Sequence, residues 1–221
     1  HARTWFDRDG VDLIVNLNNT AVAIVVNNLA REKNKLVMNT GGASDILTNE
    51  HCAPTAIHYT YDSYALANGA VRGMLAQGKK EWFILGVDYA FGKAMSANIT
   101  EFVQAGGGKV VGSSHHPLNA SDFSSFLLQA QGSKAPVIVL ANATSDTVNT
   151  IKAANEFGIT KGQTIVPSIM FINDIHALGL KYGQGMVFTT GFYWDRNDDT
   201  RAWAKRFFGK MKKMPSMVHA G

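Results

Sequence analysis

Short apolar segments and longer helical patterns alternate along the whole chain. Residues 82–85 and 137–140 are continuously apolar, which is typical of strands covered on both faces in a parallel sheet. Between such segments, apolar residues recur every three or four positions, as at Met95, Ile99 and Val103, and this spacing predicts helices. The pattern predicts strands at Val11–Leu17, Lys35–Thr40, Trp82–Asp88, Lys109–Ser114, Pro136–Asn142, Thr164–Phe171 and Met186–Thr190.

Glycines mark the ends of the predicted helices at regular intervals. Gly78, Gly106, Gly132 and Gly158 each follow a helical pattern, 26 to 28 residues apart. Glycine suits this position because it adopts the left-handed conformation without a steric penalty. Each interval accommodates one strand and one helix, so the chain is predicted to be a doubly wound α/β protein.

Composition agrees with a folded globular protein, since 46% of the 221 residues are apolar and 17% are charged. The single cysteine, Cys52, excludes an internal disulfide. The longest purely apolar segment, Ala21–Val26, is too short to cross a bilayer. We therefore expect no direct membrane insertion.

The net charge of +4 belongs to one segment of the chain. Residues 201–213 contain six basic residues and no acid, so the remainder carries a net charge of −2. The same segment has apolar residues at helical spacing, which predicts an amphipathic helix with a solvated basic face. Because the rest of the chain is close to neutral, no nucleic-acid partner is expected.

Polar and aromatic residues follow five of the predicted strands. In doubly wound sheets, ligands bind outside the carboxyl ends of the strands. Amides, hydroxyls, glycines and aromatic rings together suit a small polar or aromatic ligand. The segments are Asn18–Thr20, Thr40–Ser44, Asp88–Gly92, Asn142–Ser145 and Phe171–Asp174.

The turn from Thr40 to Ser44 is the strongest candidate site. Gly41 and Gly42 would let a ligand approach the backbone closely, and Ser44 can cap a short helix beginning near Asp45. Free N–H groups at a helix start attract carboxylates. The same residues equally suit a tight strand-to-helix turn without a ligand, and local chemistry leaves both interpretations open.

Each of the other candidates also has a structural interpretation. Tyr89 and Phe91 suit either ligand stacking or core packing, and one of the two is expected to face inward. Asn142 suits a ligand contact or a helix cap, and Asp174 suits a cation site or, preferably, a cap. Trp194, beside Tyr193, could close over a ligand or pack between lobes.

The sequence lacks the common catalytic motifs. No G-x-S-x-G elbow, Walker A loop or H-E-x-x-H helix occurs. The glycines at 106–108 precede a predicted strand, so they do not form a dinucleotide fingerprint. His115 and His116 would point to opposite faces of a strand and so would not share a metal. No enzyme activity, metal or cofactor is expected.

Several segments resemble one known family in their order along the chain. They read VNNLAREKNKLVMNTGGASDIL, AIHYTYDSYALANG, VDYAFGKAM, HPLNASDFSSFLLQAQGSKAPVIVLANA, AANEFGITKGQ and GFYWDRNDDTRAWAKRF. Together they resemble the type I periplasmic binding proteins of leucine/isoleucine/valine-binding type, which serve ABC importers. The resemblance covers essentially the whole chain.

The resemblance implies two doubly wound α/β lobes with the ligand in the cleft between them. It implies crossovers near Tyr59–Asp62 and Thr190–Asp195, and a clamp on the ligand carboxylate at Gly41–Ser44. The stretch matching the family's acidic ligand contact reads Phe171-Ile172-Asn173-Asp174, and Asn142 replaces the commoner aromatic residue. Together with the strand-exit argument, it gives thirteen expected ligand-binding residues: Asn18, Asn19, Thr40, Gly41, Gly42, Ala43, Ser44, Tyr89, Phe91, Asn142, Phe171, Asn173 and Trp194.

The resemblance also implies that the chain is truncated at both ends. Residues 1–61 and 191–221 are expected to form an incomplete first lobe, and residues 62–190 the second lobe. The expected function is an extracytoplasmic, monomeric receptor in the periplasm, with a signal peptide upstream of His1. It would bind a branched or aromatic amino acid, an aromatic acid or an amide, and deliver it to an ABC permease. A cytoplasmic amide sensor of the same fold, or an α/β enzyme, is the alternative.

Overall fold

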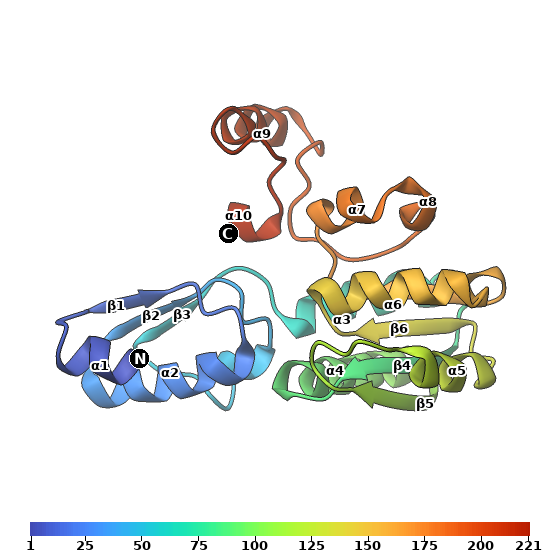
Figure 1. The fold of residues 1–221 in the computed structure, drawn as a ribbon, viewed down its shortest axis with the longest axis horizontal. Helices are drawn as coiled ribbons and strands as arrows, with labels where there is room; N and C mark the ends of the chain where they lie inside the picture. The colour runs from blue at the N-terminus through green and yellow to red at the C-terminus, as the bar shows by residue number, and fades with distance from the viewer.

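The computed structural model describes all residues, His1 to Gly221, and contains two separate parallel β-sheets (Figure 1). The first sheet has the strand order β1-β2-β3, and the second has the order β5-β4-β6-β7. Every pair of neighbouring strands is parallel. The predicted α/β class with two parallel sheets is confirmed.

The elements alternate between strand and helix over most of the chain. The strands are β1 (Leu13–Val15), β2 (Leu36–Asn39), β3 (Ala56–His58), β4 (Glu81–Val87), β5 (Lys109–His116), β6 (Val137–Ala141) and β7 (Thr164–Pro167). The helices are α1 (Ala2–Asp7), α2 (Thr20–Lys33), α3 (Ser63–Leu75), α4 (Ala90–Ala105), α5 (Ser124–Gly132), α6 (Thr144–Glu156), α7 (Ile172–Leu178), α8 (Leu180–Gly183), α9 (Asp198–Met211) and α10 (Met217–Ala220). Two 3-10 turns, η1 (Asp45–Leu47) and η2 (Ile159–Lys161), complete the set.

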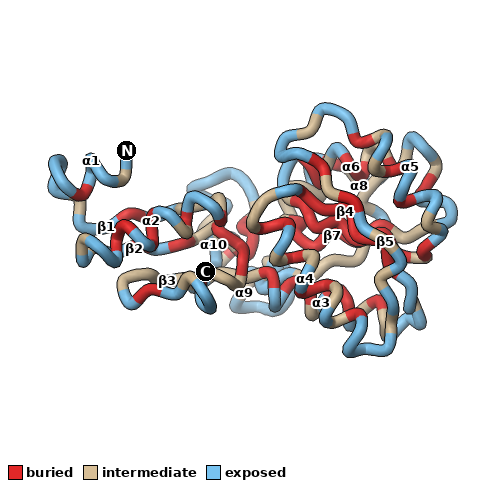
Figure 2. Tube along the Cα trace, turned by 90° about the horizontal axis from the view of Figure 1, so that it is seen from below, coloured by how far each residue is buried: buried red, intermediate tan, exposed pale blue.

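The second sheet is covered by helices on both faces. Trp82 and Ile84 of β4 belong to the core shared with α3 and α4, whereas Phe83 and Leu85 belong to the core shared with α5 and α6. In Figure 2 the buried residues run through the middle of this sheet. Burial on both faces explains why the sequences of β4 and β6 are continuously apolar.

The first sheet is covered on one face only. Ile14 and Val37 are buried against Val26 and neighbouring residues of α2. Helix α2 buries only part of its apolar pattern, since Val22 and Val25 are exposed. The residues of this chain cover only this one face, although parallel sheets are normally covered on both. The exposed apolar side chains of the sheet are Leu13, Val15, Leu36, Met38 and Ile57.

One strand prediction is wrong, and one strand was not predicted. The segment Met186–Thr190, predicted as a strand, pairs with no sheet. Its apolar side chains instead pack onto the two cores of the second sheet, and Thr189 lies against Gly69 of α3. Conversely, β3 was not predicted, because its three residues include no apolar run and Ile57 is exposed.

The glycine pattern is borne out at two of its four positions. Gly78 and Gly158 adopt the left-handed conformation, with φ of 78° and 69°. A side chain is strained there. At the other two helix ends the left-handed residue comes slightly later, at Gly107 (φ 73°) after Gly106 and at Lys134 (φ 56°) after Gly132.

A polar cluster joins the loop after β2 to the helices of the second sheet. The Ser63 hydroxyl donates to Asp45 Oδ1 at 2.6 Å and accepts from the Asp45 N–H at 3.1 Å. Asn98 Nδ2 donates to Ser63 Oγ at 2.9 Å and to Asp45 Oδ1 at 3.1 Å. Since Asp45 lies in η1, Ser63 in α3 and Asn98 in α4, this Asp45–Ser63–Asn98 cluster ties the two sheets together.

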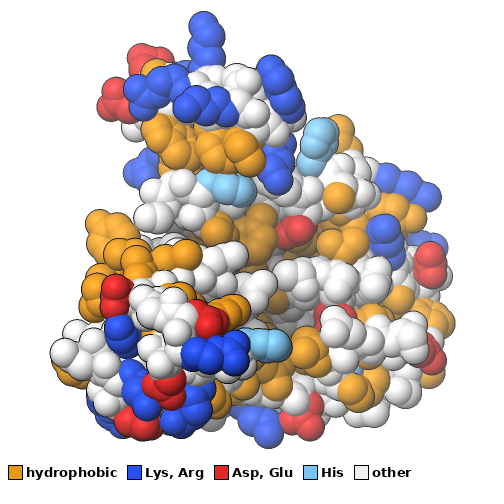
Figure 3. Space-filling view, turned by 60° about the vertical axis from the view of Figure 1, so that its left-hand side comes forward, with side chains coloured by type: hydrophobic (Ala, Val, Ile, Leu, Met, Phe, Trp, Pro, Cys, Tyr) orange, Lys and Arg blue, Asp and Glu red, His pale blue; other side chains and the backbone are white.

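The basic segment near the C-terminus forms the predicted amphipathic helix, α9. Trp203 stacks on Phe207, with ring centroids 5.6 Å apart, and packs edge-on against Phe192 at 5.3 Å. Figure 3 shows basic side chains on the outer surface of this helix, with hydrophobic side chains beneath them. None of the helices of the protein is both long and apolar enough to span a bilayer.

Candidate functional site

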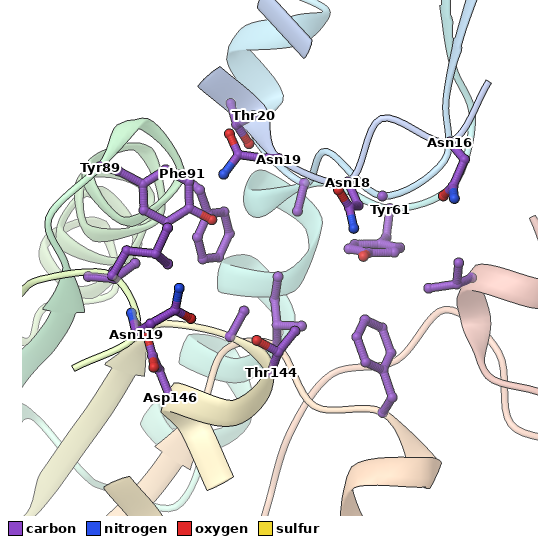
Figure 4. Close-up of a pocket in the computed structure, with 18 residues that line it drawn as sticks. Asn16, Asn18, Asn19, Thr20, Tyr61, Tyr89, Phe91, Asn119, Thr144 and Asp146 are labelled. Atoms are coloured by element: carbon purple, nitrogen blue, oxygen red, sulfur yellow. Dashed lines mark hydrogen bonds between the residues drawn. The ribbon is translucent and has the colours of Figure 1, made fainter. Parts of the chain in front are cut away.

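A cavity of about 420 Å³ lies between the carboxyl ends of the strands of the two sheets. Every strand contributes to it through the residues that end or follow it, and Figure 4 shows side chains from both sheets around one open space. This is the location at which doubly wound sheets bind ligands. The lining residues are Asn16, Asn18, Asn19, Thr20, Gly41, Ala43, Tyr61, Val87, Tyr89, Phe91, Leu118, Asn119, Ala143, Thr144, Asp146, Ile169, Phe171 and Val218.

On the first-sheet side, backbone donors are available to a ligand. Asn19 caps α2, since its Oδ1 accepts from the Val22 N–H at 3.1 Å. The N–H groups of Gly41 and Ala43 donate to no acceptor within the protein. Gly41 packs closely on Asn18, because a Cβ at Gly41 would lie 3.0 Å from the Asn18 Cβ. Free amides beside the start of a 14-residue helix suit an anionic or carbonyl oxygen.

The remaining residues of the Thr40–Ser44 turn lie outside the cavity lining. Thr40 Oγ1 donates to Asn16 Oδ1 at 3.2 Å. Gly42 packs on Leu47, which is 3.1 Å from the position a Cβ would take. Ser44 is buried, and its hydroxyl accepts from the Ile46 N–H at 3.4 Å, so it caps η1 as expected. Their role in the structure is to shape the turn that presents Gly41 and Ala43.

On the second-sheet side, two aromatic residues follow β4. Phe91 is buried in the core and also reaches the cavity, while Tyr89 is half-buried, with its ring centroid 6.0 Å from that of Phe91. The expectation that one of the two faces inward is met. Burial raises the pKa of Tyr89, and the nearby Asp146 carboxylate raises it further. The phenol therefore stays protonated and is able to donate a hydrogen bond.

Tyr61 and Phe171 form another aromatic wall. Their rings meet edge to face, with centroids 5.8 Å apart. Burial, with contributions from Tyr89 and Asp174, raises the pKa of Tyr61 to about 12. Asp174 does not line the cavity; its Oδ2 accepts from the Phe171 N–H at 2.9 Å, so it caps α7 from inside the first turn. Burial raises the pKa of Asp174, and that hydrogen bond partly offsets the effect.

Asn142 is buried away from the cavity. Its Nδ2 lies 3.0 Å from His116 Nε2 and donates to Thr150 Oγ1 at 3.2 Å, while its Oδ1 accepts from Thr147 Oγ1 at 2.8 Å. Both Nδ2 and Oδ1 of the Asn142 amide have partners within the protein. Asn142 therefore links β5, β6 and α6, and the residues that reach the cavity are those just after it.

Asn173 and Trp194 line a different cavity. That space, of about 570 Å³, lies between α7, α8 and α9 and is bounded mainly by apolar side chains. Both residues were predicted to contact the ligand because they follow strand-like segments. In the structure they lie near the basic helix α9 instead.

Several residues of the cavity were not expected from the sequence. Asn119 was missed because β5 continues to His116, two residues past its predicted end. Asp146 lies in the first turn of α6, beyond the strand exit that was considered. Extending each strand exit by one helical turn would have found both of these residues. Asn16 and Tyr61 were also missed, whereas Thr20 and Thr144 lie in the expected strand-exit segments but were not among the thirteen residues.

The protein contains no group of three or more His, Cys, Asp or Glu side chains arranged to hold a metal ion. Two parallel sheets that present their strand ends to a shared, mostly uncharged cavity define a ligand-binding α/β protein. The sequence profile of the periplasmic binding protein family matches residues 1–221. The chain belongs to this family, in its type I form.

Solved structures agree with this assignment. A periplasmic binding protein from Burkholderia mallei is 55% identical, with a TM-score of 0.94 over 99% of this chain and 58% of its own. A branched chain amino acid ABC transporter periplasmic ligand-binding protein from Burkholderia xenovorans LB400 is 41% identical, with a TM-score of 0.83 over 99% of this chain and 59% of its own. The chain thus spans less than two thirds of these relatives.

A more distant structure shares the fold. A solute binding protein of an ABC transporter from R. palustris, in complex with 4-hydroxybenzoate, is 20% identical, with a TM-score of 0.88 over 99% of this chain and 60% of its own. Comparison with curated protein sequences finds no match. Members of the family and the solved relatives are non-enzymatic solute-binding proteins of ABC transporters.

Proposed function

We propose that the full-length protein is an extracytoplasmic solute receptor that delivers a small organic ligand to an ABC permease. The observation that carries this proposal is the cavity itself, to which the ends of all seven strands contribute. A cavity of about 420 Å³ is in the range of small-molecule sites. The relative from Burkholderia xenovorans, at 41% identity, is described as a branched chain amino acid binder, which supports a ligand of similar size.

The cavity is proposed to lie between two lobes, residues 1–61 with 191–221 and residues 62–190. The first would supply Asn18, Asn19, Gly41 and Ala43, and the second would supply the aromatic residues. A ligand that contacts both sides would stabilise a closed arrangement, because it binds that arrangement better than an open one. A permease would then recognise the closed form.

Recognition of the ligand is proposed to combine hydrogen bonds with aromatic packing. The unpaired N–H groups of Gly41 and Ala43, next to the start of α2, would bind a carboxylate or carbonyl oxygen. Phe91, Tyr61 and Phe171 would enclose the apolar part. The expected ligands are therefore branched or aromatic amino acids, aromatic acids and amides.

Titration calorimetry of the full-length protein against a panel of these compounds tests the proposal. Asn18→Ala removes an amide at the cavity, and we expect it to weaken binding of the tightest panel member about tenfold. Asn49→Ala is the matched control, because Asn49 is exposed and lies outside the cavity. Absence of binding by every panel member would contradict the receptor function, and equal losses in the two variants would contradict the site.

A further inference from the structure

The cavity of about 570 Å³ between α7, α8 and α9 is separate from the ligand cavity at the strand ends. No residue lines both of them. Figure 1 shows α7 and α8 on one side of this second cavity and α9 on the other. Its volume is in the range of small-molecule sites. The chain therefore offers a second space of the size that a small molecule needs.

Large apolar side chains form most of the wall of the second cavity. Trp194 and Phe208 contribute aromatic rings, and Ile175 and Leu180 contribute aliphatic side chains. Leu180 is 79% exposed and Phe208 is 45% exposed, so both retain apolar surface that a hydrocarbon would remove from water. This wall favours a ligand with a sizeable hydrocarbon body.

The charged side chains that line the second cavity are lysines. Lys212 and Lys213 contribute to it, together with His176, whereas no aspartate or glutamate does. Neither lysine forms an ion pair. The acidic residues of α9 lie at the opposite end of the helix, where Asp198 pairs with Arg201 at 2.7 Å. The cavity thus carries positive charge without a counterion in the protein.

The end of helix α9 accounts for only part of this charge. Lys212 is the C-cap of α9, and a basic residue there offsets the negative end of the helix dipole, which is equivalent to about half an elementary charge. Because two lysines together exceed that amount, positive charge remains available to an anion.

We infer that the second cavity binds a free amphipathic organic acid, with its hydrocarbon body against Trp194, Leu180 and Phe208 and its carboxylate at Lys212 and Lys213. The apolar side chains line a hollow, which suits a single molecule better than the surface of a bilayer. This site uses the ring of Trp194 and the basic end of α9, neither of which reaches the first cavity.

Titration calorimetry of the full-length protein with octanoate and 2-nonanone tests the inference. In 2-nonanone a methyl group replaces the charged oxygen, so the two probes share the same hydrocarbon body. We expect octanoate to bind at least about fivefold more tightly, because only octanoate can pair with the lysines. The double variant Lys212→Gln/Lys213→Gln should remove that preference. Lys205→Gln/Lys210→Gln is the matched control, because both lysines are exposed, lie in α9 and line neither cavity.

The inference is overturned if octanoate does not bind, or if the wild-type protein binds both probes equally. A preference that survives Lys212→Gln/Lys213→Gln, or one that is lost in the control variant, also overturns it. Flotation with vesicles of phosphatidylglycerol separates a free acid from a membrane surface. Attachment to vesicles without binding of octanoate would assign the lysines to a lipid surface instead. None of these results decides the proposed receptor function, because the substituted residues do not line the first cavity.

Discussion

Replacing Ser63 with alanine tests how strongly the Asp45–Ser63–Asn98 cluster stabilises the protein. Ser63 is fully buried, and its hydroxyl is the donor to Asp45 Oδ1 and the acceptor for the Asp45 N–H. Asn98 Nδ2 would keep Asp45 Oδ1 as a partner at 3.1 Å. The loss is therefore one hydrogen bond to a charged group, about 1.5 to 3 kcal/mol, and one donor left unpaired, about 1 to 3 kcal/mol. Since these effects overlap, we expect the free energy of unfolding to fall by roughly 2 to 4 kcal/mol.

Ser124→Ala provides a matched control for this measurement. The Ser124 hydroxyl also donates to an aspartate, Asp122 Oδ1, at 2.6 Å, but this pair is exposed to water. Water can replace the hydroxyl there, so the expected loss is below about 1 kcal/mol. Equilibrium unfolding in urea measures both variants, and an unchanged slope shows that the same surface is exposed on unfolding. Similar losses for the two variants would refute the argument that burial strengthens the cluster.

Two further predictions concern single residues. Burial raises the pKa of Tyr61 to about 12, so the folded state favours the neutral phenol. The free energy of unfolding should therefore fall as the pH rises from about 10, the pKa in the unfolded state, toward 12. Tyr61→Phe should remove this loss in unfolding curves measured at alkaline pH, and an unchanged pH dependence would contradict the prediction. A Cβ at Gly92 would lie 1.9 Å from the Val87 carbonyl oxygen, so Gly92→Ala should destabilise the protein by about 3 kcal/mol or more. Gly73→Ala, a change in α3 with no atom within 4 Å of the new Cβ, should instead stabilise the protein by about 0.5 to 1 kcal/mol. Thermal unfolding measures both variants. Equal changes in stability would contradict the predicted clash between the new Cβ at position 92 and the Val87 carbonyl oxygen.

The second sheet could be predicted because its central strands are unbroken apolar runs. Strands β4 and β6 are buried on both faces, and this requires unbroken apolar runs that are visible without a structure. Strand β3 lacks such a run, since it has three residues and an exposed Ile57. The segment Met186–Thr190 has the apolar pattern of a strand but uses it to pack on existing cores. Hydrophobic pattern reports burial, and it distinguishes poorly between a strand and an extended segment lying on a core.

The location of the cavity could also be predicted, but its chemistry could not. The rule that ligands lie at the carboxyl ends of parallel strands selected Asn18, Gly41 and Phe91, which line it. The direction of a side chain depends on contacts that the sequence does not reveal. Asn142 follows a strand as expected, but its side chain lies 3.0 Å from His116 Nε2 and does not line the cavity. Asp146 reaches the cavity from within a helix, because the first turn of α6 begins at the strand exit.

Within this chain, which spans less than two thirds of its relatives, the two sheets differ greatly in how much apolar surface they bury. The core of the first sheet contains six buried apolar residues, whereas the two cores of the second sheet contain 19 and 14. Regions with few buried contacts open locally at a lower free energy and exchange their amide hydrogens sooner. A ligand held between the sheets, at a hundred times its dissociation constant, would add about 2.7 kcal/mol to the stability of the bound state. The amide hydrogens of β1, β2 and β3 would then exchange more slowly when a ligand is bound, although these strands do not line the cavity. Ligand binding would thus suppress local opening of the first sheet.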